Sequence, residues 1–224
     1  MRGFGDLALR VADAADGTRV PQELHIVVPD VNVFLDVASL LGPDWDWKNL
    51  SAAVGQYPWT PARSQDRRVD SLRALIFLRS GELVGDHIME TWTSDHILRL
   101  VRAKAEQSST AAIAEDRGLG WSHEQSVRLL DLVYETVESS GGDQINVRIP
   151  YGNPPLSHED GLVYATARDA EPDMFVHRYC LTHDNHFRKA SLPGDITMLY
   201  PHEFVSFVQR ARHLIQVTRI RRRK

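Results

Sequence analysis

The sequence is poor in cysteine and contains no long apolar run. Its 224 residues include a single cysteine, Cys180, which permits no internal disulfide and is typical of a reducing compartment. No run of 18 or more apolar residues is present, so a membrane-spanning helix is not expected. The first 17 residues carry three aspartates and lack the apolar centre of a signal peptide. These absences predict a cytoplasmic protein that does not enter a membrane.

Glycine-rich phosphate-binding motifs are also missing. Neither a G-x-G-x-x-G pattern nor a phosphate-loop lysine pattern occurs, so nucleotide binding through such a loop finds no support. The net charge is −4 and the last six residues contribute five positive charges, which leaves residues 1–218 at −9. An acidic body is not typical of a protein that coats nucleic acid. The basic end admits two interpretations, a solvated terminus or a contact for phosphate or a partner.

The composition and the apolar spacing predict one globular α/β domain. Hydrophobic residues make up 42% and charged residues 25% of the chain, which are ordinary globular values. Residues 1–22 suggest a short amphipathic extension. Strands are expected at 25–30, 87–93, 144–149, 175–182 and 196–199, and helices at 31–41, 66–79, 94–106, 122–139, 159–170 and 202–215. Strands that alternate with helices and lack tight hairpins predict a parallel sheet covered on both faces.

Residues 43–64 are expected to form a loop with an unusual number of tryptophans. Pro43, Pro58 and Pro61 interrupt the segment, which also contains Trp45, Trp47 and Trp59. The tryptophans are interpreted in two ways. They fold back onto the core as a lid, or they form a platform on which unpaired bases stack.

Three aspartates are expected at one edge of the sheet. Asp30 ends the first strand, Asp184 follows the strand that contains Cys180, and Asp160 begins a helix. Functional groups of a parallel sheet gather at the carboxyl ends of its strands. Neighbouring carboxylates repel one another unless a cation neutralises them, and oxygen ligands suit Mg²⁺ or Mn²⁺. Such an ion activates water and stabilises charge on a phosphoryl group. Each aspartate has another interpretation, as a helix cap or a turn residue.

Four motifs in order resemble those of PIN domains. The run IVVPDVNVFLDVA resembles the family's opening strand, which ends in Asp-x-Asn. SHEDGLVYATARDA (157–170) resembles its third acidic motif, LTHDNHF (181–187) its fourth, and DITMLYPHEFV (195–205) its closing strand and Pro-x-x-Phe ending. The resemblance covers roughly residues 24–208. The most similar subgroup is that of the longer PIN proteins, which resemble the toxins of bacterial toxin–antitoxin pairs.

The resemblance implies both a fold and an activity. The fold is a Rossmann-like three-layer α/β/α sandwich, with an N-terminal extension at 1–22, a PIN-like nuclease domain with helical insertions at 23–208, and a helix end and basic tail at 209–224. The activity is Mg²⁺- or Mn²⁺-dependent endonucleolytic cleavage of RNA, with Asp30, Asp160 and Asp184 as metal ligands. Asn32 would hold the first acid, and Thr182 would hydrogen-bond within the site. A protein antitoxin and a second copy of the chain are the partners that the family suggests.

The sequence departs from the family at its second acid. That carboxylate is expected near Arg99 or Leu100, and Asp95, one turn earlier, is the substitute we assign to the metal. Glu90, His96 and Asp173 are further candidates. The departure leaves open a catalytically silent PIN-fold module that binds RNA or protein.

Two other chemistries were weighed against the nuclease. A phosphatase of the haloacid dehalogenase type is disfavoured, because Asn32 occupies the position of its second aspartate. His183, His186 and Arg188 surround Asp184 and are expected to bind substrate phosphates. A zinc site from His183, His186 and Asp184 is disfavoured, because an isolated H-x-x-H lacks the remaining ligands.

Overall fold

A five-stranded sheet organises the chain. The computed structural model describes residues 24–56, 64–84, 87–111, 117–149, 151–152, 156–170, 176–190, 192 and 195–222. The strand order is β2-β3-β1-β6-β7. Strands β3 (His87–Thr91), β1 (Leu24–Pro29), β6 (Val176–Leu181) and β7 (Ile196–Leu199) are parallel, and β2 (Glu82–Val84) is antiparallel at the edge. The predicted α/β fold with a central parallel sheet is confirmed.

Strand β1 is buried because its sequence is apolar on both faces. Residues 25–29 are all buried, as expected of a central strand covered by helices on both sides. Its register with β6 pairs Val28 with Cys180 and Pro29 with Leu181, so the two strands end level with each other. This register places the residues after Pro29 and after Leu181 at the same edge of the sheet.

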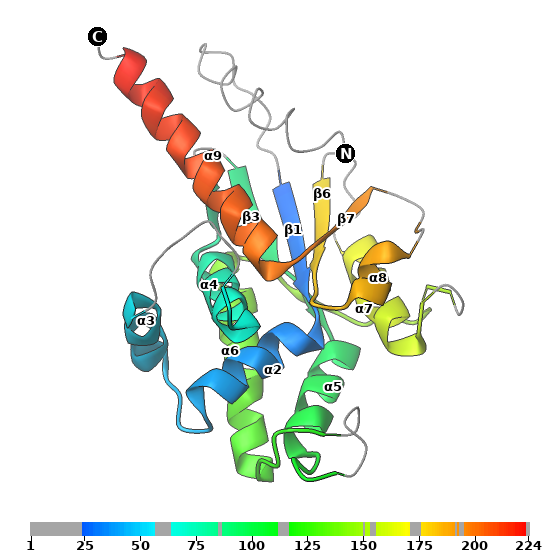
Figure 1. Ribbon diagram of the computed structural model, residues 1–224. Helices are drawn as coiled ribbons and strands as arrows, with labels where there is room; N and C mark the ends of the chain where they lie inside the picture. Colours follow the sequence, from blue (N-terminus) through cyan, green and yellow to red (C-terminus); the bar gives the residue numbers. More distant parts are fainter. Residues whose placement is uncertain are drawn as a thin grey trace.

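Helices cover both faces of the sheet and form a three-layer sandwich. Figure 1 shows α9 in front of the sheet and α7 on the side away from it. The helices are α2 (Val31–Leu41), α3 (Trp47–Gln56), α4 (Arg67–Ser80), α5 (Asp95–Glu106), α6 (His123–Ser140), α7 (His158–Asp169), α8 (Asn185–Lys189) and α9 (Pro201–Arg222). A minor sheet pairs β4 (Thr93–Ser94) with β5 (Gln144–Ile145). None of the helices in the described ranges has the length and apolarity that a bilayer span requires.

Local sequence signals define several helix ends. Ser94 caps α5 by accepting a hydrogen bond from the Ile97 N–H. Ser122 and Gln125 form the predicted capping box of α6. Gly81 ends α4 with φ at 64°, in the left-handed region that favours glycine. These predicted boundaries are confirmed.

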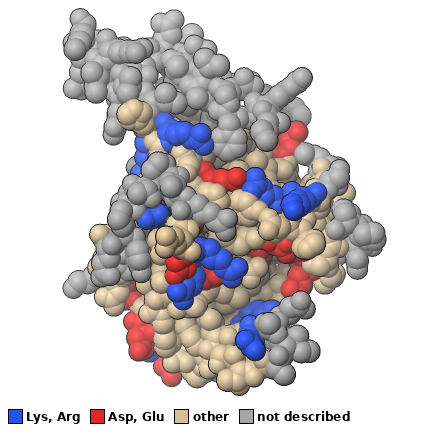
Figure 2. Space-filling model, in the orientation of Figure 1, with Lys and Arg blue, Asp and Glu red and all other residues tan. Residues whose placement is uncertain are grey.

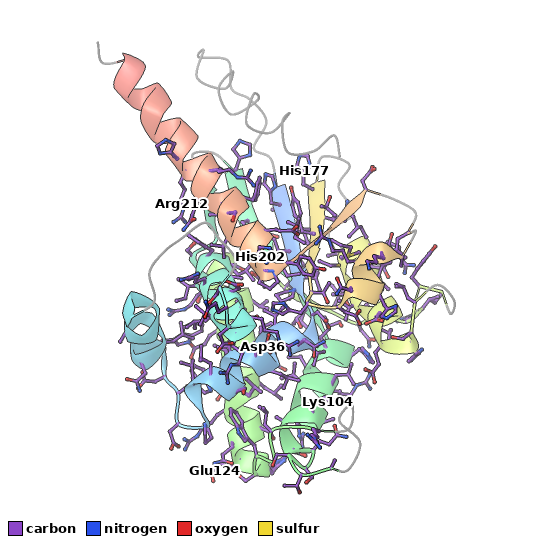
Figure 3. All side chains as sticks on the ribbon, viewed as in Figure 1. Asp36, Lys104, Glu124, His177, His202 and Arg212 are labelled. Carbon is purple, nitrogen blue, oxygen red and sulfur yellow. The ribbon has the colours of Figure 1, made fainter. Side chains whose placement is uncertain are left out.

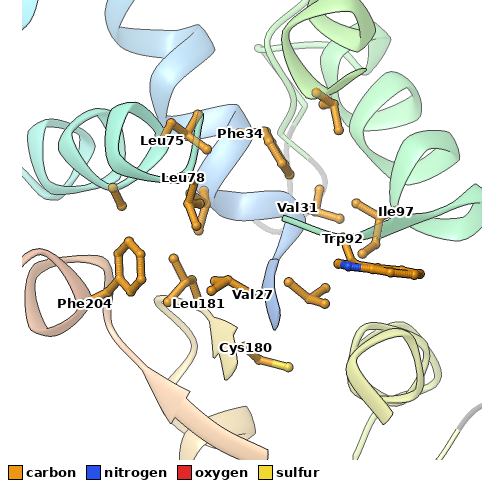
Figure 4. Close-up of a cluster of buried hydrophobic side chains, with 14 of the residues drawn as sticks. Val27, Val31, Phe34, Leu75, Leu78, Trp92, Ile97, Cys180, Leu181 and Phe204 are labelled. Carbon is orange, nitrogen blue, oxygen red and sulfur yellow. The ribbon is translucent and has the colours of Figure 1, made fainter. Parts of the chain in front are cut away.

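The core lies on both sides of β1 and β6. Figure 4 shows Leu181 and Val27 between the strands and the helices that carry Leu78 and Phe204, while Cys180 points toward the other layer. All five side chains are buried. Successive side chains of β6 point to opposite faces of the sheet, so β6 packs against both helical layers. This packing fixes the position at which the loop after β6 begins.

Several predicted elements were wrong. Residues 43–64 are not loop throughout, because α3 occupies 47–56. The β2–β3 pair is antiparallel with a short connection, although no hairpin was expected. The strand predicted at 144–149 is limited to Gln144–Ile145, and α9 continues to Arg222 instead of ending at 215. The predicted extension at 1–22, Trp59 and Asp173 lie outside the described residues.

Candidate active site

Asp30 is a buried carboxylate at the carboxyl end of β1. Its backbone N–H donates to the Leu181 carbonyl at 2.8 Å, which fixes it against the end of β6. Its Oδ2 accepts a hydrogen bond from Thr182 Oγ1 at 2.9 Å and one from Asn32 Nδ2 at 3.3 Å. Asp30 occupies the N-cap position of α2, yet its side chain makes no capping hydrogen bond. The interpretation of Asp30 as a helix cap therefore fails, and the structure brings Asn32 and Thr182 to this carboxylate.

Asp160 lies in the first turn of α7, where two features hold it. Ser157 Oγ accepts from the Asp160 N–H at 3.1 Å and donates to Asp160 Oδ2 at 2.9 Å. The next residue, Gly161, allows the chain at Tyr151 to pass closely, because a Cβ there would lie 2.3 Å from the Tyr151 carbonyl oxygen. Ser157 therefore caps α7, but the carboxylate of Asp160 bonds to the Ser157 hydroxyl and does not complete a capping box with the Ser157 N–H.

Asp184 begins α8, just past the end of β6. Its Oδ1 accepts hydrogen bonds from the N–H groups of His186 at 2.6 Å and Phe187 at 3.3 Å. Its own N–H donates to Thr182 Oγ1 at 2.9 Å. Asp184 is therefore a helix cap, as the simpler interpretation holds. Through Thr182 it is also connected to Asp30.

The three acids influence one another electrostatically. The pKa of Asp30 is raised to about 6, mainly by burial and also by the charge of Asp160, while the hydrogen bond from Thr182 opposes the shift. Burial also raises the pKa of Asp160, with further contributions from the charges of Asp184 and Glu159. Negative charge is thus crowded at this edge of the sheet, and a cation would relieve it.

The chemistry of these oxygens fits a hard divalent cation, but their present spacing is not that of a closed metal site. Asp30, Asp160 and Asp184 supply the oxygen ligands that Mg²⁺ and Mn²⁺ prefer. Within the part of the chain that the structure describes, no group of three or more His, Cys, Asp or Glu side chains is arranged to hold a metal ion. An ion would therefore have to draw the acids together or complete its shell with water.

The second acid of the family pattern has no replacement in the described residues. Asp95 accepts a hydrogen bond from Gln144 Nε2 and forms no metal-holding group with the three acids. Glu90 accepts from Trp92 Nε1 at 3.0 Å. His96 lies near His158, with ring centroids 6.1 Å apart, and burial lowers its pKa. The assignment of Asp95 to the metal therefore finds no geometric support.

His183 has a different environment from the one expected. Only 8% of its side chain is exposed, and its Nε2 lies 2.8 Å from Ser71 Oγ and 3.3 Å from Asp36 Oδ2. Such a residue holds the loop in place and does not present itself to a phosphate. Since His183 faces inward, the H-x-x-H zinc interpretation also fails in the described structure.

His186 and Arg188 lie on the exposed side of α8. His186 is exposed, and its charge lowers the pKa of Asp160, so it lies near that acid. Arg188 forms an ion pair with Glu203 at 3.0 Å, and its guanidinium lies 4.2 Å from the centre of the Tyr200 ring. Of the three residues expected to bind phosphate, His186 is the one that the structure leaves exposed beside an acid.

Trp45 and Trp47 are partly buried side chains at the hydrophobic core. Both pack against the hydrophobic core and meet edge to face, with centroids 5.9 Å apart. The Arg79 guanidinium lies 3.9 Å from the Trp47 ring centre. For these two tryptophans the folded-back interpretation is confirmed, and stacking of bases on them is not supported.

Sequence reasoning missed Asp36, Ser71 and Arg67. Asp36 is buried four residues after Asn32, which places both on one face of α2. Ser71 Oγ donates to Asp36 Oδ2 at 3.2 Å, and Arg67 lies 3.2 Å from Oδ1. The i, i+4 spacing of Asn32 and Asp36 on a mostly apolar helix was the available signal.

The chain has a Rossmann-like α/β/α fold, and Asp30 and Asp184 follow the carboxyl ends of two neighbouring parallel strands. Comparison of the chain with protein-family models, with curated proteins and with solved structures gives no match. Membership of the PIN family therefore stays a prediction from the four motifs.

Proposed function

We propose that the chain is a metal-dependent endoribonuclease that hydrolyses RNA phosphodiester bonds. The observation that carries the proposal is that Asp30, Asp160 and Asp184 influence one another electrostatically at one edge of a parallel sheet. Thr182 also forms hydrogen bonds with Asp30 and Asp184. A structural role alone gives no reason to gather three carboxylates at an edge where burial disfavours the charge of Asp30 and of Asp160.

The acids would hold one or two Mg²⁺ or Mn²⁺ ions. When bound, such an ion activates water and stabilises charge on the phosphoryl group. Asp30 would be the fixed ligand, because Thr182 and Asn32 both orient its Oδ2. Asp160 and Asp184 each use one oxygen in local hydrogen bonds and would offer the other. His186 would contact a substrate phosphate beside Asp160.

Cleavage of RNA by the purified chain tests the proposal. Single-stranded and structured RNA are incubated with Mn²⁺, with Mg²⁺ and with EDTA. We expect cleavage with either ion, none with EDTA, and a loss of about 100-fold or more in Asp30→Asn, since metal sites depend strongly on their ligands. Asp131→Asn is the matched control, because Asp131 is an exposed carboxylate on α6. Cleavage that persists in EDTA, or in Asp30→Asn, would contradict the proposal.

A second function is favoured by one specific observation. Arg99 stands where the family pattern has its second acid, and Asp95 forms no metal-holding group with the three acids among the described residues. A PIN-fold module that binds RNA or protein without cutting it would lack this acid in the same way. Calorimetric titration with Mn²⁺ separates the two functions. A folded protein that neither binds Mn²⁺ nor cuts RNA fits the silent module, and one that does both fits the nuclease.

The biological role as a toxin is a further part of the proposal. It is supported by the resemblance of the four motifs to toxins of toxin–antitoxin pairs, as are a protein antitoxin and a homodimer. Growth arrest on expression of the wild-type chain, absent with Asp30→Asn at equal protein level, is the expected result. Equal growth with both would contradict the toxin role and leave the nuclease untouched.

A further inference from the structure

A buried carboxylate that contacts the residue before Asp184 holds an exposed arginine. Asp36 lies on α2 with 7% of its side chain exposed, and Figure 3 shows it between α2 and α4. Its Oδ2 receives Ser71 Oγ at 3.2 Å and lies 3.3 Å from His183 Nε2. Its Oδ1 lies 3.2 Å from a terminal nitrogen of Arg67. Oδ2 of Asp36 therefore makes contacts inside the protein, and Oδ1 pairs with Arg67.

The inner contacts are structural and not a nucleophilic triad. In such a triad the histidine uses one ring nitrogen for the serine and the other for the acid. Here Ser71 and Asp36 both contact Nε2 of His183. Ser71 is also fully buried, so a substrate cannot reach its hydroxyl. The effect of these contacts is to fix the orientation of the Asp36 carboxylate.

Arg67 is anchored at one end and open to solvent at the other. More than half of its side chain, 57%, is exposed, while a terminal nitrogen is paired with Asp36. A guanidinium has five N–H donors in a planar fork, so one ion pair leaves donors for a second anion. Asp36 also contacts His183, the residue directly before Asp184. The cation therefore stands beside the loop that carries the third acid.

The negative charge of the three acids gives a reason for an arginine near them. An edge that gathers three carboxylates repels the phosphates of RNA unless positive groups lie next to it. Figure 2 shows basic side chains on this face in separate groups close to acidic ones, without a continuous basic patch. Arg188, on α8, is already paired with Glu203 and lies over Tyr200.

We propose that Arg67 binds a phosphate of the RNA substrate and that Asp36 orients its guanidinium for this contact. The inference rests on the proposed function, because it names the substrate contact of the same site. Arg68 provides a matched control. It is the next residue, it is 41% exposed, and it pairs at 2.7 Å with Asp66, the cap of its own helix, instead of Asp36.

RNA binding by variants of a cleavage-deficient chain tests the proposal. The affinity of Asp30→Asn for a short fluorescent single-stranded RNA is measured in Mg²⁺ at several KCl concentrations, alone and with Arg67→Ala, Arg67→Lys or Arg68→Ala added. We expect Arg67→Ala to weaken binding about fivefold and to reduce the slope of log affinity against log salt by about 0.7, the loss of one contact to a single strand. Arg67→Lys should retain most of the slope but not all of the affinity, because it keeps the charge without the fork.

The outcomes separate this inference from the nuclease itself. Equal effects of Arg67→Ala and Arg68→Ala would overturn the phosphate contact, while cleavage by the wild-type chain would still support the nuclease. Absence of RNA binding at low salt would overturn the contact as well. A selective Arg67 effect in a chain that cuts no RNA would support the contact and count against catalysis. Urea unfolding of each variant verifies that all are folded.

Discussion

Thr182 donates a hydrogen bond of 2.9 Å to Asp30 Oδ2 across 152 positions of sequence. The same hydroxyl accepts the N–H of Asp184 at 2.9 Å. One oxygen therefore connects the carboxylate at the end of β1 with the acid that begins α8. The bond favours the charged form of Asp30 in a place where burial disfavours it. Thr182 therefore helps to fix the position of the first acid and favours its charged form.

Thr182→Val is expected to remove the hydrogen bond to Asp30 while leaving the side-chain volume nearly unchanged. Valine has nearly the same shape, but it leaves a buried carboxylate without its best donor, which costs about 1–3 kcal/mol of stability. Cleavage should fall more strongly than stability predicts, because Asp30 loses its orientation. The measurement is urea unfolding beside initial rates of RNA cleavage. Thr197→Val, at an exposed position of β7, is the control, and an equal loss in both variants would contradict the role of Thr182.

The raised pKa of Asp30 predicts a stability that depends on pH in the metal-free protein. Because the folded pKa is about 6 and the usual value is 3.8, the folded state binds the extra proton, and stability falls as pH rises from about 4 to 6. The shift corresponds to at most about 3 kcal/mol. Asp30→Asn should remove this dependence. Unfolding in EDTA at several pH values measures it, and parallel profiles for both proteins would contradict the prediction.

The elements that could be predicted from the sequence are those determined by residues close together in the chain. The apolar run before Asp30 predicts a buried strand, and the serine caps at positions 94 and 122 begin the helices where expected. The carboxyl ends of β1 and β6 meet because parallel strands with crossovers share an edge, which is why the sequence predicts Asp30 and Asp184 at the same edge.

The parts that sequence reasoning missed depend on contacts between distant elements. Helix α3 has only a weak local signal among prolines, and its Trp47 meets Arg79 of another helix. The inward turn of His183 depends on Ser71 and Asp36, which lie on two other helices. A histidine beside a carboxylate looks the same in sequence whether it faces solvent or the core. Side-chain direction in a loop is therefore decided by packing partners that no local pattern reveals.

Gly161 is expected to be required by close backbone packing next to Asp160. A Cβ at this position would lie 2.3 Å from the Tyr151 carbonyl oxygen, so Gly161→Ala must shift the backbone at the start of α7. We expect a loss of about 1–3 kcal/mol and a reduction of cleavage through Asp160. Gly55→Ala is the matched control on α3, because no atom lies within 4 Å of its added Cβ. That variant should be neutral or about 0.5 kcal/mol more stable. Urea unfolding of both decides, and equal stability would contradict the prediction.

The opposite end of the sheet predicts a second dependence on pH. His25 on β1 is buried, its Nε2 lies 3.3 Å from His87 Nδ1, and its ring stacks on that of His177 with centroids 4.9 Å apart. Figure 3 shows His177 at the end of the sheet away from Asp36. Burial, together with the charges of His177 and His87, lowers the pKa of His25 to about 3.

Acid should therefore destabilise the protein through His25. The unfolded chain takes up a proton near pH 6.5, whereas the folded chain does so near pH 3, so stability present above pH 6.5 is lost as pH falls through this window. At about 1.4 kcal/mol per pKa unit the effect is several kcal/mol at most. His25→Phe keeps an aromatic ring for stacking and cannot gain charge. It should lose stability at pH 7.5, where its hydrogen bonds are missing, and recover relative to the wild type at pH 5. His123→Phe, at an exposed position of α6, is the control. A constant difference between His25→Phe and the wild type at both pH values would show that His25 is not the acid-sensitive group.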